Sequence, residues 1–257
     1  MLYLAFFIIY TFIFVFGICI GSFLNVAVYR LPNHISIAYG RSFCPKCHKQ
    51  IPNRDLIPIF SYLHLKGLCR NCQAPISPRY PLVEAFTGLL AVGLFWYYGF
   101  NLTALVIFSV ACILTIIALI DIDTMTIPNN LLIALSIPAV LIYWFFPEIS
   151  LLARIIGFFA VSLPMFLLNF IKADAMGGGD IKLMAVSGFM LGWQNILLAM
   201  FIALLASGLA IVYLLAAKQK TTQSHIAFGP YLCLGIITAL VYGKPIIELY
   251  FAFFNLY

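Results

Sequence analysis

The sequence contains few charged residues for its length. Of 257 residues, 9% are charged and 64% are hydrophobic, whereas soluble domains are about a quarter charged and about half apolar. This composition excludes a soluble globular fold for most of the chain. Only eight residues are acidic. A carboxylate at membrane depth costs roughly 2.5–3.5 kcal/mol even on the most lenient insertion scale, so an unpaired structural use of one there is unfavourable.

The first 29 residues contain no charged side chain. A removable signal peptide begins with a basic segment and continues with a short apolar one, but this run is uncharged and too long, so we expect a retained first helix. Runs of about 20 apolar residues span the hydrocarbon core. Such runs predict eight spans. The sixth is short, because the residues Gly192–Asn195 separate it from the seventh. The tail 244–257 is left unassigned. The expected spans are 2–26, 82–100, 102–120, 129–146, 151–171, 181–193, 195–217 and 228–243.

Lysine and arginine are concentrated in one long polar segment, 30–81, which holds eight of the fourteen. Threading eight spans from this segment places four more on the same side: Lys172, Lys182, Lys218 and Lys220. Only Arg154 and Lys244 fall on the other side. Because positive residues remain cytoplasmic, we expect 30–81 in the cytoplasm. The net charge of +6 then reflects topology and attraction to anionic membrane lipid, and no nucleic acid is needed to explain it.

Two C-x-x-C pairs lie in this segment, Cys44 with Cys47 and Cys69 with Cys72, separated by 21 residues. The spacing is typical of a four-thiolate zinc site, in which the metal staples a loop too small to hold a core of its own. Two disulfides would need an oxidising compartment, and a thioredoxin-like pair would need a βαβ context. We therefore predict structural zinc bound by these four cysteines.

Two aspartates fall at the ends of predicted spans on the same side of the membrane. Asp121 ends the third span and Asp180 begins the sixth, directly after three glycines. Two carboxyls brought together can share one proton. The ionised one then takes a proton from water and the protonated one donates to a peptide carbonyl, which is aspartyl proteolysis without a metal. Taken alone, Asp121 with Asp123 can also be a cation site or a solvated cap, and Asp180 an N-cap.

Segments along nearly the whole chain resemble the bacterial type IV prepilin peptidases, intramembrane aspartyl proteases of the G-x-G-D type that also carry N-methyltransferase activity. The similar segments are Gly21 to Val26, Tyr29 to Pro32, both C-x-x-C pairs, Ile76 to Glu84, Asp121 to Pro128, Gly177 to Asp180 and Phe228 to Leu232. The resemblance implies that Asp121 and Asp180 are the catalytic pair, with Asp123 the less favoured partner. It also implies a multi-pass protein of the bacterial inner membrane.

The same resemblance implies a substrate and a second reaction. The substrate would be a prepilin or pseudopilin, cut just after a glycine on the cytoplasmic side. The new N-terminal residue would then be methylated from S-adenosylmethionine. No segment forms a nucleotide-binding signature, so the methyl-donor site stays unassigned. We expect an all-α polytopic membrane protein with a first helix at 1–29, a zinc-binding loop domain at 30–81 and a peptidase domain at 82–257.

Two non-enzymatic functions compete with this interpretation. In a transporter or channel, Asp121, Asp123 and Asp180 would form an ion or proton relay, but such charges usually lie near the bilayer midplane in internally repeated folds. Here the acids lie at one edge, and the sequence shows no repeat. A structural assembly factor would use its zinc loop to dock a partner, and it would tolerate the loss of either aspartate.

Overall fold

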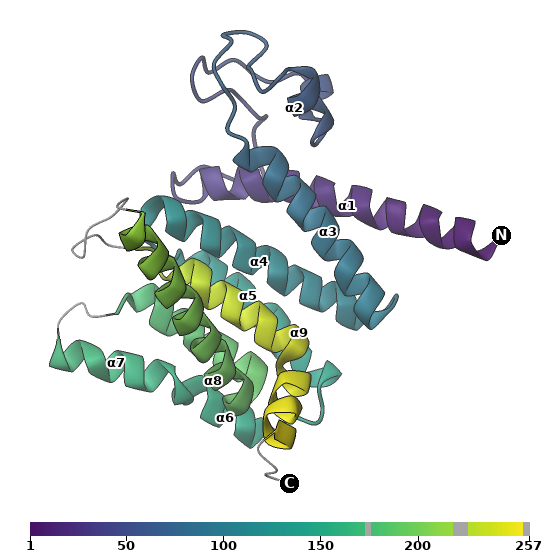
Figure 1. The fold of residues 1–257 in the computed structure, drawn as a ribbon. Coiled ribbons are helices and arrows are strands. Elements are labelled where there is room, and N and C mark those ends of the chain that lie inside the picture. Colours follow the sequence, from purple (N-terminus) through teal and green to yellow (C-terminus); the bar gives the residue numbers. More distant parts are fainter. Residues whose placement is uncertain (173–175, 218–225, 254–257) are drawn as a thin grey trace. The chain divides into compact units, whose positions relative to one another are not determined.

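A computed structural model describes residues 1–172, 176–217 and 226–253, and over these ranges the chain is built from helices without a named strand (Figure 1). Two compact units divide the chain, Met1–Phe108 and Ser109–Tyr257, and each is described by itself. The elements are α1 (Leu2–Arg30), the short 3-10 turn η1 (Asn53–Leu56), α2 (Phe60–His64), α3 (Arg79–Tyr98), α4 (Leu102–Thr124), α5 (Asn129–Phe145), α6 (Leu151–Ala160), α7 (Ser162–Ile171), α8 (Gly178–Ala216) and α9 (Gly229–Phe253).

Six helical segments of the described ranges are long and apolar enough to cross a membrane: α1, α3, α4, α6 together with α7, α8, and α9. Helix α5 has 17 residues and is shorter. The predicted sixth and seventh spans are the two helical segments of α8, which meet at a kink at Gly192, where φ is 76° and ψ is 169°. The sequence therefore predicted this break correctly, because the backbone at Gly192 is not helical and separates the two segments.

The first unit is organised by close packing of α1 on α3. A Cβ on Gly17 would lie 2.7 Å from the Cα of Gly88, and one on Gly21 would lie 2.8 Å from the Cα of Glu84. The two backbones can therefore approach directly, as small residues allow between membrane helices. Helix α1 continues to Arg30, beyond the end predicted at residue 26.

The side chain of Arg30 ties the start of the loop to the end of α1. It is buried, and its guanidinium donates hydrogen bonds to the carbonyl oxygens of Ser36, Tyr39, Gly40 and Arg41. A planar group with five donors can satisfy several loop carbonyls at once. This arginine therefore organises the beginning of the polar segment.

In the second unit, α8 packs against α5, α6, α7 and α9. The buried Arg154 of α6 donates to the carbonyl of Phe146 at 3.0 Å and to that of Met190 at 2.7 Å. Met190 lies in the turn just before Gly192, where the helix bends. A cation beside the last carbonyls of a helical segment also complements the helix dipole. Arg154 thus stabilises the bend from within the bundle.

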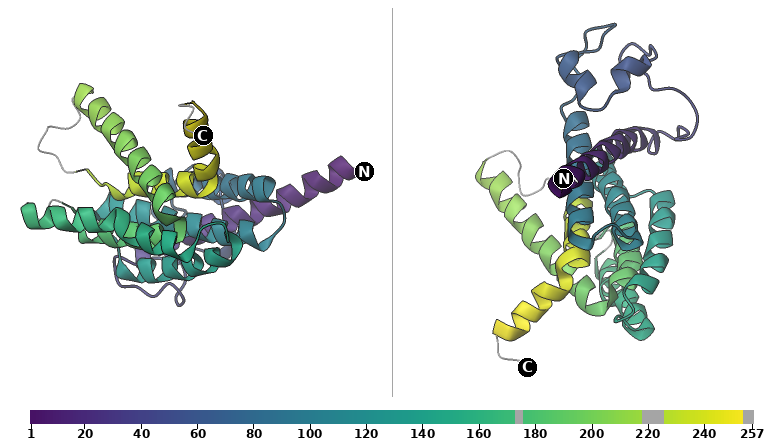
Figure 2. Two further views of the ribbon diagram at one scale, coloured as in Figure 1. Left: turned by 90° about the horizontal axis from the view of Figure 1, so that it is seen from below. Right: turned by 90° about the vertical axis from the view of Figure 1, so that its right-hand side faces the viewer.

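Helix α9 continues past residue 243, where the last predicted span ended, through Pro245 to Phe253. Figure 2 shows that α9 changes direction in its C-terminal part, as expected where proline removes a backbone hydrogen bond. Lys244 forms an ion pair with Glu148 at 3.1 Å. The threaded topology places both residues on the same side, and their contact agrees with it. Lys218 and Lys220 lie outside the described residues.

Candidate active site and metal centre

The buried carboxylate of Asp121 is the centre of the candidate active site. Asp121 lies near the end of α4 with 5% of its surface exposed. One of its oxygens accepts a hydrogen bond of 2.8 Å from the backbone N–H of Gly229, the first residue of α9. The first N–H groups of a helix have no partner within the helix, and they carry its positive dipole end. The start of α9 therefore both fixes this carboxylate and favours its charge.

The neighbouring Asp123 is exposed, because two residues along a helix turn the side chain by about 200°. Helix α4 ends just beyond it. The N–H of Met125 donates to the carbonyl of Asp121 at 2.8 Å, and Met125 has a φ of 52°. This left-handed residue stops the helix and starts the short turn to α5. The end of α4 thus presents Asp121 inward and Asp123 outward.

Asp180 enters the same site from the first turn of α8. It is partly buried, and it lies within electrostatic range of Asp121. The thiol of Cys233, one turn into α9, lies within range of both carboxylates. The second unit therefore brings together the two predicted aspartates, 59 residues apart in the sequence, where α4, α8 and α9 converge.

The three glycines before Asp180 have different surroundings. A Cβ on Gly179 would lie 2.8 Å from the Cβ of Ile127, in the turn after α4. A Cβ on Gly177 would lie 2.9 Å from a carboxylate oxygen of Asp180, while one on Gly178 would meet nothing within 4 Å. Space for a side chain is therefore lacking at Gly179, and its close approach to Ile127 holds the start of α8, with Asp180, against the turn that follows α4.

Two polar links fix the chain on either side of these glycines. The side-chain amide of Asn169 in α7 donates to the carbonyl of Met176 at 3.0 Å and accepts from its N–H at 2.8 Å. The ammonium of Lys182 donates to the side chain of Asn129, the first residue of α5, at 3.0 Å. The segment that carries Asp180 is therefore held at both ends.

The four predicted zinc cysteines come together in the first unit. Their sulfur atoms all lie within 4.8 Å of one another, and those of Cys44 and Cys72 are 3.9 Å apart. Four sulfurs at about 2.3 Å from one Zn²⁺ ion in a tetrahedron are about 3.8 Å apart. None of the four forms a disulfide. The donor set and its spacing fit a four-thiolate metal site.

Both C-x-x-C pairs are folded in the same way. In the first, the N–H of Cys44 donates to the carbonyl of Lys49, and the N–H of His48 donates to that of Cys44. In the second, the N–H of Cys69 donates to Ala74, and the N–H of Gln73 donates to Cys69. His48 and Gln73 both have a φ of 55°. Each pair is thus a tight turn that offers two sulfurs to one ion.

Local electrostatics prepare these thiols for a cation. Backbone N–H groups of Cys72 and Asn71 lower the pKa of the Cys69 thiol to about 7. The N–H of Ala74 acts in the same direction on Cys72, but desolvation and the neighbouring sulfurs outweigh it and raise the pKa of Cys72 to about 11. Four neighbouring thiols cannot all ionise without a cation, because the thiolate charges repel one another. A metal ion at their centre offsets this repulsion.

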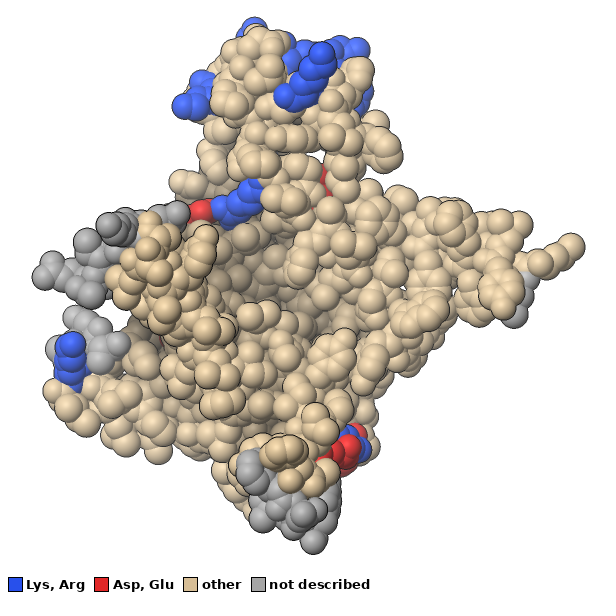
Figure 3. Space-filling view, in the orientation of Figure 1, with Lys and Arg blue, Asp and Glu red and all other residues tan. Residues whose placement is uncertain are grey.

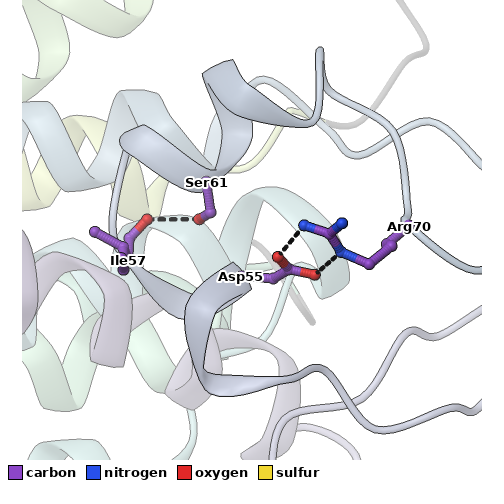
Figure 4. A network of polar contacts seen from close by, with 4 residues as sticks. All are labelled: Asp55, Ile57, Ser61 and Arg70. Atoms are coloured by element: carbon purple, nitrogen blue, oxygen red, sulfur yellow. Dashed lines mark hydrogen bonds and ion pairs between the residues drawn. The ribbon is translucent and has the colours of Figure 1, made fainter.

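An ion pair reinforces the same loop. Arg70, between the cysteines of the second pair, donates two hydrogen bonds of 2.7 Å to the carboxylate of Asp55 (Figure 4). This contact lowers the pKa of Asp55 and raises that of Arg70. Lysine and arginine side chains gather on the outer face of the loop segment (Figure 3). Its exposed surface is therefore basic, as the sequence predicted.

Taken together, the fold and these residues define a multi-pass helical membrane protein with a paired-aspartate site and a four-thiolate loop. Two family models match the chain: "Bacterial Peptidase A24 N-terminal domain" over residues 15–98 and "Type IV leader peptidase family" over residues 108–215. The first match contains the four cysteines, and the second contains both aspartates.

Curated relatives match over almost their whole length. A protein of Bacillus subtilis named "Prepilin leader peptidase/N-methyltransferase" is 34% identical, covering 93% of this chain and 96% of its own. Proteins with the same name from Aeromonas hydrophila and Pseudomonas aeruginosa are 31% and 30% identical, covering 94% and 92% of this chain and 93% and 91% of their own. The chain belongs to the type IV leader peptidase family. No solved structure matches it.

Sequence reasoning missed the groups that hold the aspartates in place. The N–H of Gly229, which is 108 residues from Asp121, lies in the segment 228–232 that carried part of the family resemblance, but spacing alone gave no reason to pair the two. Asn169 carried no signal at all. Backbone donors and single amides of this kind become visible only when the helices are placed.

Proposed function

We propose that this chain removes the leader from prepilins or pseudopilins, with Asp121 and Asp180 as its catalytic pair. The observation that carries the proposal is the convergence of a buried, hydrogen-bonded Asp121 with Asp180 in the unit matched by the leader peptidase family. The relatives named for this reaction cover more than nine-tenths of the chain. The exposed position of Asp123 supports Asp121 as the catalytic member of the first motif.

The chemistry needs only the two carboxyls and one water molecule. The ionised carboxyl takes a proton from the water, whose oxygen attacks the scissile carbonyl carbon. The protonated carboxyl donates to the carbonyl oxygen. When the C–N bond breaks, the amide nitrogen takes a proton, leaving a carboxylate on the leader and a free amine on the mature chain. The hydrogen bond from Gly229 supports Asp121 as the ionised member and Asp180 as the member that holds the proton.

The location of the reaction follows from charge. The bias of lysine and arginine toward the side of the 30–81 segment supports a cytoplasmic loop in a bacterial inner membrane protein. Asp121 ends its helix and Asp180 begins its own, so both belong at the membrane edge, where water is available. A leader that extends from a membrane-inserted helix would present its cleavage point at this depth.

Two further components complete the proposal. The four cysteines bind a structural zinc ion, a role supported by the mutual distances of their sulfur atoms. The new N-terminal amine is then methylated from S-adenosylmethionine, as the names of the relatives indicate for those proteins. Cleavage itself requires no metal, because both proton transfers are assigned to carboxyls.

The test is leader removal from a coexpressed pilin precursor by the parent and by Asp121→Asn, Asp180→Asn and Asp123→Asn. Asparagine keeps the size of the side chain but cannot accept the proton from water, so we expect the first two variants to be inactive and Asp123→Asn to retain substantial activity. An inactive Asp123→Asn with an active Asp121→Asn would reverse the assignment. Cleavage by both Asp121→Asn and Asp180→Asn would reject the aspartyl mechanism.

Orientation is tested separately with single introduced cysteines. A cysteine within 30–81 should be shielded from an impermeant thiol reagent in intact cells, and one beside Glu148 should react with it. The opposite pattern would place both aspartates on the wrong side of the membrane for this substrate.

A further inference from the structure

A cavity of about 420 Å³ lies within the first unit, bounded by the ends of α1 and α3 and by the polar loop. This volume is in the range of sites for small molecules. Its walls include Asn25 and Tyr29 from α1, Tyr80 and Glu84 from α3, and Ile59 from the loop. A smaller cavity of about 280 Å³ in the second unit is lined by 143–144, 147 and 149–151, none of which is acidic or basic.

The cavity holds a buried carboxylate with neutral partners. Glu84 is 7% exposed, and one of its oxygens accepts a hydrogen bond of 2.7 Å from the N–H of Ile59. It also interacts with the hydroxyl of Ser22. A carboxylate has about four acceptor sites, so two donors leave part of its capacity unused. By contrast, both oxygens of Asp55, on the same wall, are taken by Arg70.

The loop is strained where it meets this carboxylate. Ile59 has a φ of 62° and a ψ of −52°, and the N–H of Phe60 donates to the carbonyl of Pro58 at 2.6 Å. This is a γ-turn of the rare, strained kind, and it is especially unfavourable for a β-branched residue. Such strain is retained where the surroundings impose it, and it is typical of ligand sites. Glu84 imposes it here by holding the N–H of Ile59.

We propose that this cavity is the binding site for the methyl donor, S-adenosylmethionine, and that Glu84 faces its sulfonium cation. The inference rests on the proposed function, which supplies the second reaction but not its place. The cavity lies wholly within the part of the chain matched by the N-terminal domain model, 15–98, and outside that matched by the leader peptidase model, 108–215.

The lining matches the chemistry of this ligand. S-adenosylmethionine joins an aromatic base to a sulfonium and to an amino acid with its own carboxylate. The buried Glu84 supplies a negative charge for the sulfonium, and the rings of Tyr29 and Tyr80 offer stacking and cation–π contacts. Lys46 and Lys49 also line the cavity and supply positive charge for the ligand's carboxylate. Arg30 cannot take that role, because four loop carbonyls already occupy its guanidinium.

The test measures binding of radiolabelled S-adenosylmethionine to the full-length protein in detergent, by equilibrium dialysis and by photocrosslinking with mapping of the labelled peptide. We expect the label within 22–84 and expect Glu84→Gln, which keeps the shape but removes the charge, to weaken binding by about tenfold or more. Glu148→Gln is the matched control, because that carboxylate is exposed and pairs with Lys244; it should bind as the parent does. Zinc content and leader cleavage report whether each variant is folded.

Three results would count against the inference in different ways. If the parent binds and methylates but the label maps to 109–217, the cavity is not the donor site and the proposed function stands. Unchanged binding by a folded Glu84→Gln rejects the role of the carboxylate. If the parent cleaves leaders but neither binds the donor nor methylates a trimmed pilin, the methyltransferase half of the proposed function fails. The crosslink map needs no variant, so the test holds even if Glu84→Gln does not fold.

Discussion

The glycines before Asp180 allow a sharp test, because two adjacent positions differ only in the space around them. Replacing Gly179 by alanine would place a Cβ 2.8 Å from the Cβ of Ile127. Carbon atoms in contact are about 3.5–4.0 Å apart, so the two segments must separate by roughly 1 Å. Ile127 cannot easily yield, because its branched side chain has few rotamers and Pro128 restricts its backbone.

The size of the effect follows from that displacement. A misplacement of about 1 Å at a reacting group can cost about 100-fold in rate, so kcat/KM for leader cleavage by Gly179→Ala should fall by about that factor. Gly178→Ala is the matched control, since its Cβ would meet nothing within 4 Å, and it should cleave at close to the parent rate. The assay uses purified enzyme and a pilin precursor. Equal activity of the two variants would refute the argument that contact at Gly179 positions Asp180.

Other contacts give further predictions. Gly229→Ala would place a Cβ 2.6 Å from a carboxylate oxygen of Asp121. This variant should lose leader cleavage but still methylate a trimmed pilin. Retained cleavage would show that other groups hold Asp121. Arg154→Met leaves buried carbonyls without a donor and should lower the free energy of unfolding in detergent by about 3 kcal/mol. Lys244→Met, at an exposed ion pair, should change the same free energy by less than about 1 kcal/mol. Similar losses in the two variants would contradict the stabilising role of Arg154. Purified protein should contain one zinc ion, and acidification should release it as protons compete with the metal for the thiolates. Metal content that does not change as the pH falls would argue against four thiolate ligands.

Features encoded in local sequence were predicted correctly. Apolar length gave the positions of the helices, and the glycine at 192 gave the bend in α8. The spacing of the cysteines predicted a cluster that the structure bears out. Asp121 and Asp180 were expected at helix ends, and the structure places them there, close together. That they are the catalytic residues remains a prediction.

Features that depend on the meeting of distant segments could not be predicted. Helix α9 continues through Pro245, although proline usually favours an end, because a bent helix can still pack on α8. Arg154 was assigned only by its side of the membrane, yet it supplies the buried donor at the bend in α8. The N–H of Gly229 and the cavity beside Glu84 each require elements that sequence alone does not place. Their energies arise from tertiary contacts rather than from local propensity.

The metal site and the cavity share residues, so loss of the metal ion should affect one of the two activities and not the other. Cys44 and Cys69 belong both to the thiolate cluster and to the wall of the 420 Å³ cavity. Asp121 and Asp180 lie in the other unit. Loss of the metal ion would therefore disorder the wall of the cavity but leave Asp121 and Asp180 in place. Cells starved of zinc, or exposed to an oxidant of thiols, should accumulate pilins that are trimmed but not methylated, whereas no condition acting on the loop alone should yield methylated precursors.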